Sequence, residues 1–396
     1  MNNILNKDRI YSLLDKIMET IYNKDNKYDN VGLLSGTVGE SIFIQKYSLL
    51  INENYLDKLN NNIDIIYQKI DDTNISSTYC SGIAGVCLGL DYIYQKSFGD
   101  DHIPFDFISL DIEEYLFEEM KKFISKNDFD FLHGAIGVGL FFLEKVKKGY
   151  LDDMKYLDYL VDSLIKSSIE DEKDVFKWKD KDGLVNISLS HGMSSILIFL
   201  LDVYSLNLEN SSILEKYIKG GIKFILKQKL EDKKFISLFP SNYKSLIVEE
   251  IKGSRLGWCY GDLGIAILFR KYSEVFNDKD IYELYEQILE HSLNRKSYKE
   301  SLIVDVSICH GAIGISMILF NEFILTKNPM YQDIAIYWLN KSISMLESDL
   351  DSTFFNVLTM KNEKPTNLLE GLSGIGLILL GFLHPEETDW NKFLLL

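Results

Sequence analysis

The sequence predicts an all-α fold in which seven helix pairs close into a ring of seven inner and seven outer helices. Three observations lead to this prediction. A glycine-centred motif recurs seven times along the 396 residues. Each motif is followed by a mostly apolar run of about ten residues, typical of a helix buried on most sides. Strand-like alternation is scarce, and only five prolines interrupt the helical pattern.

The motif consists of a small or polar residue followed by G-x-x-G. Six copies keep the second glycine, and Ser195 replaces it in the fourth copy. The copies are SGTVG (35–39), SGIAG (81–85), HGAIG (133–137), HGMSS (191–195), YGDLG (260–264), HGAIG (310–314) and EGLSG (370–374). Their spacing of about 50 residues is that of a helix-pair repeat, which must stack on its neighbours to bury its apolar face.

The helices that follow the motifs are expected inside the ring because they have almost no polar face. Longer amphipathic stretches between the motifs, such as ILEKYIKGGIKFILKQ (213–228), are expected outside, where one face covers the core. The glycine-rich loops would then converge at one end, an α/α toroid. We expect one domain over residues 1–396, with a short β-prone excursion at 235–256.

Composition excludes several classes of protein. A net charge of -17 argues against nucleic-acid binding, which needs a basic face. An acidic surface would tolerate or attract a cationic partner, but most acidic proteins are acidic only for solubility. No window has the 18 or more consecutive apolar residues of a membrane span, so an integral membrane protein is not expected. The N-terminus lacks the apolar core of a secretory signal, and the chain has only four cysteines. These features predict a cytoplasmic protein.

Cysteine and histidine gather at the fifth and sixth motifs. Cys259 precedes the YG of the fifth, and Cys309 and His310 precede the first glycine of the sixth. If neighbouring loops lie side by side, two thiolates and an imidazole meet. Such a set suits zinc, and three protein ligands leave a fourth position open for chemistry. The alternative is structural, because a free cysteine is commonly a small buried hydrophobic residue.

Two cysteine motifs carry a resemblance to a known family. R-x-x-W-C-Y-G (Arg255 to Gly261) and C-H-G-x-x-G (Cys309 to Gly314) resemble the lanthionine synthetase C-like family, which comprises the lanthipeptide cyclases. S-H-G at Ser190 and D-x-x-x-G at Asp130 also fit its pattern. The resemblance extends from the first glycine motif to the seventh, and it implies an α/α toroid of seven inner and seven outer helices.

The resemblance implies a zinc-dependent lanthipeptide cyclase with one Zn²⁺ per chain, bound by Cys259, Cys309 and His310. Zinc-bound peptide cysteine thiols would add to dehydroalanine or dehydrobutyrine and form (methyl)lanthionine rings. His191 is the expected proton donor, and Asp130 is expected to orient or charge-balance a histidine or to help take up the thiol proton.

Further positions are assigned less specifically. Arg255 and Tyr260 are candidate donors to the developing oxyanion or to the peptide carbonyl. His133 occupies the slot of His191 one repeat earlier and is a secondary candidate. From the residues alone, the favoured interpretation of His191 is a structural residue that caps its loop. The other cysteines and histidines are expected to have no chemical role, and Cys80 and Cys87 are assigned to the core: Cys80, Cys87, His102, His291 and His384.

Several functions remain open at this point. A stand-alone cyclase would act on a dehydrated precursor peptide with its leader, with a separate dehydratase and an exporter as further partners. A related zinc enzyme would add a small thiol such as glutathione to dehydroamino acids in proteins. A helical-repeat peptide-binding scaffold would have no catalysis and no metal. A toroidal glycosidase or terpene-type enzyme is disfavoured, since the motif slots hold Cys, His and Tyr with a lone Glu370.

Overall fold

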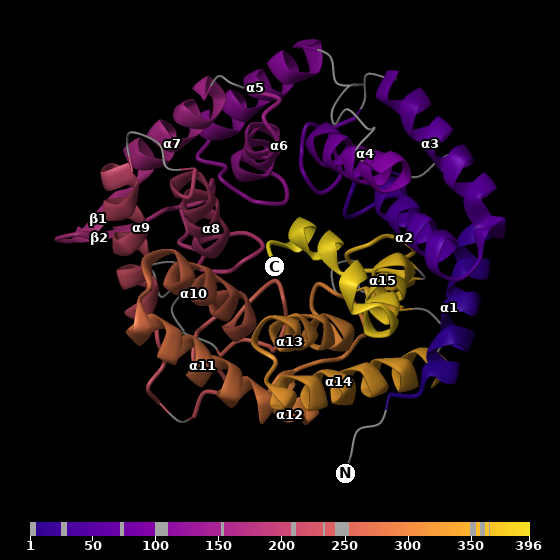
Figure 1. Ribbon diagram of the computed structural model, residues 1–396. Helices are drawn as coiled ribbons and strands as arrows, with labels where there is room; N and C mark the ends of the chain where they lie inside the picture. Colours follow the sequence, from indigo (N-terminus) through magenta and orange to yellow (C-terminus); the bar gives the residue numbers. More distant parts are fainter. Residues whose placement is uncertain are drawn as a thin grey trace. The chain divides into compact units, whose positions relative to one another are not determined.

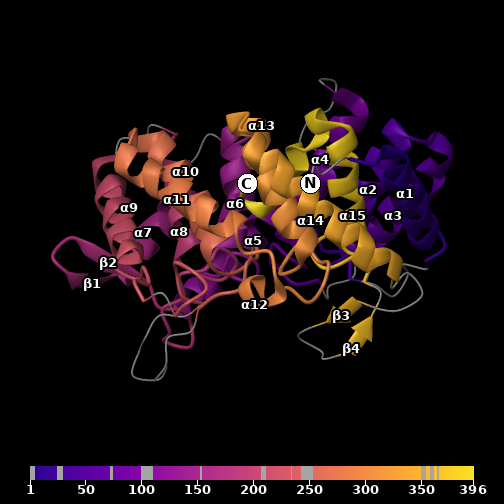
Figure 2. The same cartoon turned by 90° about the horizontal axis from the view of Figure 1, so that it is seen from below.

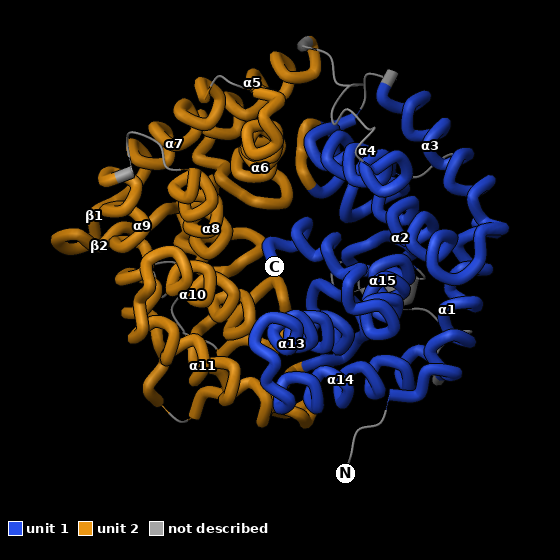
Figure 3. Tube along the Cα trace, viewed as in Figure 1, with its two compact units in different colours: residues 1–76, 80–102, 303–396 blue, residues 77–79, 103–302 orange. Residues whose placement is uncertain are grey.

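A computed structural model gives the fold and describes residues 5–24, 30–71, 75–99, 110–151, 154–206, 211–232, 234–241, 253–348, 354–356, 361–363 and 365–396. Helices dominate this part of the chain, as predicted. The chain divides into two compact units (Figure 3). Unit 1 comprises residues 1–76, 80–102 and 303–396, and unit 2 comprises residues 77–79 and 103–302.

Unit 1 has an inner row and an outer row of helices (Figure 1). The inner helices are α2 (Thr37–Leu50), α4 (Ile83–Phe98), α13 (Ala312–Thr326) and α15 (Leu372–Leu383). The outer helices are α1 (Lys7–Tyr22), α3 (Leu56–Asp71) and α14 (Pro329–Ser348), and the short 3-10 helices are η1 (Glu53–Tyr55), η3 (Pro385–Glu387) and η4 (Asp389–Leu394). In the inner row α13 packs against α15, α15 against α2, and α2 against α4.

Unit 2 repeats this arrangement (Figure 1). Its inner helices are α6 (Ala135–Lys147), α8 (Met193–Tyr204) and α10 (Asp262–Phe276), and each packs against the next. Its outer helices are α5 (Leu110–Ser125), α7 (Lys155–Ser167), α9 (Ser211–Leu226) and α11 (Lys279–Leu293), followed by the short α12 (Tyr298–Ser301). The inner helices of both units are buried along most of their length, and α15 (LSGIGLILLGFL) is buried from Leu372 to Phe382, as its composition predicts.

Two small antiparallel hairpins interrupt the helices. β1 (Ile169–Glu172) pairs with β2 (Val175–Lys177), and β3 (Phe354–Asn356) pairs with β4 (Lys361–Glu363). The β3–β4 hairpin connects α14 to α15 and projects beyond their ends (Figure 2). Strands of three or four residues are too short to give a periodic signal, so the sequence did not predict them. Within the expected excursion at 235–256, Pro240 and Gly253 form an antiparallel bridge, and residues 242–252 lie outside the described residues.

Every inner helix begins directly after the first glycine of a motif, which confirms that part of the prediction. In six of the seven loops, the N–H of the first helical residue donates to the carbonyl of the residue seven positions earlier. These bonds are Thr37–Asn30 (2.9 Å), Ile83–Ser76 (2.8 Å), Ala135–Asp128 (2.9 Å), Met193–Asn186 (2.7 Å), Ala312–Asp305 (3.0 Å) and Leu372–Pro365 (3.0 Å). Six of the loops therefore share one backbone conformation. In each, the bond satisfies the first N–H of the inner helix, which would otherwise lack a partner.

Glycine is required in these loops because other atoms lie so close to the glycine backbone that they leave no room for a Cβ. A Cβ on Gly374, the second glycine of the seventh motif, would overlap the carbonyl oxygen of Leu368. Gly261 in the fifth motif has φ +92°, a conformation that L side chains rarely adopt, and a Cβ there would overlap the hydroxyl of Ser254. The fifth loop, which carries Cys259 and Tyr260, therefore departs from the geometry of the others.

Neighbouring loops within a unit are joined through the residue two positions before the first glycine. The N–H groups of Cys309, Leu369 and Leu34 donate to the carbonyls of Leu369 (3.2 Å), Leu34 (2.9 Å) and Cys80 (2.9 Å), respectively, in unit 1. Ser190 donates in the same way to Cys259 (3.3 Å) in unit 2. Residues immediately before the first glycine therefore become neighbours, although they are about 50 or more residues apart in sequence.

Candidate functional site

Three aromatic side chains from successive loops of unit 2 lie side by side. His133, His191 and Tyr260 each occupy the position before the first glycine of their motif. The rings of His133 and His191 are stacked with centroids 6.2 Å apart, and those of His191 and Tyr260 are tilted with centroids 6.0 Å apart. The variable position of the repeat thus brings together two sequence-predicted residues and the secondary candidate His133.

Asp130 connects two of these loops. One carboxylate oxygen, Oδ1, accepts the backbone N–H of His133 at 2.7 Å, and the other, Oδ2, lies 2.6 Å from Nδ1 of His191. The first contact holds the Asp130 carboxylate within its own loop. The second orients the imidazole of the next loop, so Nε2 is the ring nitrogen of His191 left free for chemistry.

The loops fix their functional residues by one recurring device. A side chain four positions before the first glycine accepts the backbone N–H of the residue before that glycine. These pairs are Asp130–His133 (2.7 Å), Ser188–His191 (3.2 Å), Ser307–His310 (3.4 Å) and Asn367–Glu370 (2.8 Å). Short polar side chains commonly make such local bonds in turns, and here they fix the backbone from which each functional side chain projects.

The electrostatics of the His191–Asp130 pair favour the charged form of both groups. Burial lowers the pKa of His191, but the hydrogen bond to Asp130 and its negative charge outweigh burial and raise that pKa above its ordinary value. For Asp130, burial raises the pKa, but the hydrogen bond and charge of His191 outweigh it and the pKa falls. His133 differs, because burial dominates and its pKa is lowered. Adjacent imidazoles are thereby biased toward opposite protonation states.

A cavity of about 340 Å³ opens in front of this group within unit 2. Asp130, His133, His191 and Tyr260 line it. The remaining lining residues mix charged, aromatic and aliphatic side chains: Asp128, Phe129, Trp178, Lys179, Asp180, Lys181, Asp182, Asn186, Gly192, Met193 and Ile196. Ligand sites are typically cavities in which a few polar groups stand among apolar side chains, and the His191–Asp130 pair lies in the wall of this one.

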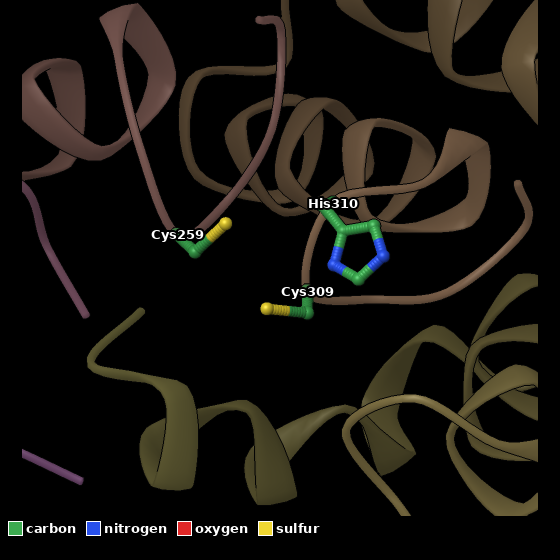
Figure 4. Close-up of side chains that lie close together, drawn as sticks. All are labelled: Cys259, Cys309 and His310. Atoms are coloured by element: carbon green, nitrogen blue, oxygen red, sulfur yellow. The ribbon is translucent and has the colours of Figure 1, made fainter. Parts of the chain in front are cut away.

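Cys259, Cys309 and His310 form one group whose candidate ligand atoms all lie within 4.8 Å of one another (Figure 4). Cys259 and His310 are buried, and Cys309 is half-buried. The two sulfur atoms and one ring nitrogen of His310 face the same point in Figure 4. Two soft sulfurs and an imidazole are a donor set that fits Zn²⁺ and leaves one tetrahedral position open.

His310 also has a partner on its other side. Its Nε2 lies 3.0 Å from Oδ2 of Asp305, a residue that is 5% exposed. Histidines that bind metals almost always give their second ring nitrogen to such an acceptor. The sequence analysis missed Asp305. A signal was present, since an Asn or Asp stands six residues before the first glycine in four of the seven motifs: Asn30, Asp128, Asn186 and Asp305.

The other positions considered in the sequence lie outside the two groups described above. Arg255 is half-buried in the loop that carries Tyr260, and it is not among the residues that line the cavity. Cys80 and Cys87 are buried, in agreement with their assignment to the core. His291 lies beside a buried ion pair, with its Nδ1 3.7 Å from Asp262, and Nδ1 of His384 lies 3.6 Å from Glu386. His102 lies outside the described residues.

Comparisons with known proteins agree with this geometry. Residues 27–395 match the family profile of the lanthionine synthetase C-like protein. The chain is 26% identical to the nisin biosynthesis protein NisC of Lactococcus lactis subsp. lactis over 430 residues, which cover 100% of this chain and 97% of that protein.

The solved structure of nisin cyclase matches with a TM-score of 0.72 at 21% identity, and the match covers 98% of this chain and 97% of that one. This likeness confirms the predicted α/α toroid fold. Within the described part of the chain, no helix combines the length and hydropathy needed to cross a bilayer. Since the family profile spans nearly all of its residues, this chain is a member of the lanthionine synthetase C-like protein family.

Proposed function

We propose that the protein is a zinc-dependent lanthipeptide cyclase that closes (methyl)lanthionine rings in a dehydrated precursor peptide. The observation that supports this best is the group of Cys259, Cys309 and His310, whose ligand atoms lie within 4.8 Å of one another, in a chain of this family. One zinc ion per chain would be held there. Bound zinc lowers the pKa of a coordinating thiol, so a peptide cysteine reacts as its thiolate near neutral pH.

The ring-closing step balances without an added reagent. The sulfur of a peptide cysteine forms a bond to the β-carbon of dehydroalanine or dehydrobutyrine, and the carbon–carbon double bond opens toward the neighbouring carbonyl. The resulting enolate takes a proton at its α-carbon. The thiol has lost one proton and the α-carbon gains one, so the product is an isomer of the dehydrated peptide.

His191 is the residue that would deliver this proton. Its Nδ1 is held by Asp130 at 2.6 Å, which leaves Nε2 free, and the hydrogen bond and charge of Asp130 raise its pKa, which favours the protonated form. Its loop is joined to that of Cys259 through the hydrogen bond from Ser190 to the Cys259 carbonyl, at 3.3 Å. Tyr260, whose ring is next to that of His191, and Arg255 in the same loop are the candidate donors to the enolate oxygen.

The substrate is a dehydrated precursor peptide with its leader, and a separate dehydratase and an exporter are the expected partners. The net charge of -17 suits a cationic peptide. A cytoplasmic location, including attachment to the membrane surface within a biosynthetic complex, belongs to the same proposal.

The test is cyclisation of a dehydrated precursor peptide produced with a separate lanthipeptide dehydratase. Because cyclisation leaves the mass unchanged, free thiols are alkylated and counted by mass spectrometry. The zinc-loaded protein should remove alkylatable thiols, whereas the Cys309→Ala variant should not. Addition of glutathione to the peptide without ring closure would indicate the small-thiol enzyme. Binding of the peptide without any reaction would indicate a scaffold and would contradict the proposal.

A further inference from the structure

The contact between Asp305 and His310 in unit 1 suggests a role for a residue that the proposed reaction does not yet use. Nε2 of His310 lies 3.0 Å from Oδ2 of Asp305. The two side chains are 10% and 4% exposed. Within the described part of the chain, Oδ2 accepts no hydrogen bond of ordinary geometry, and the imidazole of His310 is the one basic group within ion-pair distance of it. The oxygen is therefore directed at the imidazole alone.

The position of the carboxylate is fixed by its own loop. Oδ1 of Asp305 accepts the backbone N–H and the hydroxyl of Ser307, both at 2.8 Å. The carbonyl of Asp305 accepts the N–H of Ala312, the first residue of α13, at 3.0 Å. Three bonds thus hold the residue, and Oδ2 cannot leave His310 without breaking part of the turn.

The negative charge is not needed to build this turn. In the first and fourth loops the same position is an asparagine, and its Oδ1 accepts the equivalent N–H of Gly32 at 2.6 Å and of Ser188 at 2.9 Å. A neutral amide therefore makes the same loop. Burying a carboxylate in place of an amide costs free energy unless the carboxylate is paired. The negative charge of Asp305 must therefore serve a purpose other than building the turn.

The orientation of the imidazole indicates that use. Figure 4 shows one ring nitrogen of His310 turned toward the sulfurs of Cys259 and Cys309 and the other turned away. Since Nε2 is held by Asp305, the nitrogen beside the sulfurs is Nδ1. A neutral imidazole that donates its Nε2–H has a lone pair on Nδ1, as a metal ligand requires.

We propose that Asp305 is a positioning residue that accepts the Nε2 proton of His310 and presents Nδ1 as the metal ligand. This inference rests on the proposed zinc site. Asp305 acts through His310 and has no contact with the substrate in this scheme. Its contribution is to the affinity and geometry of metal binding, which can be measured without any peptide.

The first experiment compares zinc affinity by competition with a chromogenic chelator in the wild type and in Asp305→Asn. The amide keeps the Oδ1 acceptor of the turn and removes the charge facing Nε2. We expect affinity to fall about 10- to 100-fold, with the stoichiometry unchanged at saturating zinc. The matched control is Asp128→Asn, the same substitution at the same loop position beside no metal ligand, and its affinity should equal that of the wild type.

The outcomes separate the two proposals. If the wild type binds no zinc, the proposed function is wrong. If the wild type binds zinc and Asp305→Asn binds it equally well, the role of Asp305 is wrong and the zinc site stands. A fall in affinity that Asp128→Asn shares would also contradict a specific role for Asp305.

A second measurement uses the unmutated protein and does not depend on the variant folding. Long-range ¹H–¹⁵N correlation of histidine-labelled, zinc-loaded protein distinguishes a metal-bound Nδ1 with protonated Nε2 from the reverse. The His310 signals are assigned by their loss in His310→Gln. We expect zinc on Nδ1 and the proton on Nε2. Zinc on Nε2 would overturn the inference.

Discussion

Replacing Asp130 with asparagine should slow cyclisation about 10- to 100-fold without unfolding the protein. The amide oxygen can still accept the backbone N–H of His133, a bond that is 2.7 Å long in the structure. The charged contact of 2.6 Å to Nδ1 of His191 is lost. A hydrogen bond to a charged group contributes about 1.5–3 kcal/mol. If the transition state loses that amount, the rate falls tenfold for each ~1.4 kcal/mol.

The same substitution should change the pH dependence of the reaction in a defined direction. In the proposed reaction His191 donates a proton, so the active form would be the protonated one, which persists below its pKa and is lost as pH rises through it. Asp130 raises this pKa, whereas burial lowers it. Removing the charge leaves burial in place, so the pKa of His191 falls. The alkaline limb of the kcat/KM profile should therefore move to lower pH in Asp130→Asn.

The assay is the rate of thiol loss from a dehydrated precursor peptide, measured across pH by alkylation and mass spectrometry. Asp57→Asn is the matched control, because it removes a carboxylate of α3 that accepts a hydrogen bond from Tyr22 at 3.0 Å. It should leave the profile unchanged. An Asp130→Asn variant that keeps the wild-type rate and the wild-type alkaline limb would refute the assignment of the His191–Asp130 pair.

Three further predictions concern the proton donor and the fifth loop. His191→Ala should retain zinc but form product more slowly, and normal cyclisation by this variant would disprove the proton-donor role. Arg295→Ala should lower the free energy of unfolding by about 3–5 kcal/mol, because the buried carboxylate of Asp262 loses the guanidinium that lies 3.0 Å from it. Urea unfolding followed by circular dichroism measures this free energy. A loss below about 1 kcal/mol would contradict the prediction. Gly261→Ala should cost about 1–3 kcal/mol in backbone strain, with the overlap against Ser254 in addition, and an unchanged melting temperature would show that the loop can relax.

Much of the fold could be predicted from the sequence because the repeat specifies it locally. A glycine that the loop needs for close backbone approach stands directly before each buried helix, so each motif marks both the loop and the helix start. The hairpins β1–β2 and β3–β4 could not be predicted, because each strand has only three or four residues and no periodic pattern.

The candidate site was predicted in part for the same reason. Residues in equivalent positions of neighbouring repeats become neighbours, so Cys259, Cys309 and His310 could be grouped from their place in the motif. The pairing of Asp130 with His191 depends on which side chain of one loop reaches the next, and spacing alone cannot give that. Asp305 was missed because its contact with His310 depends on side-chain orientation within the turn.

Zinc content tests the central claim most directly. Elemental analysis of purified protein should find about one zinc per chain in the wild type. Cys259→Ala, Cys309→Ala and His310→Ala should each lose most of it, whereas His191→Ala should keep it. A wild-type protein that takes up no zinc on reconstitution, or that binds it equally well without Cys309, would contradict the account.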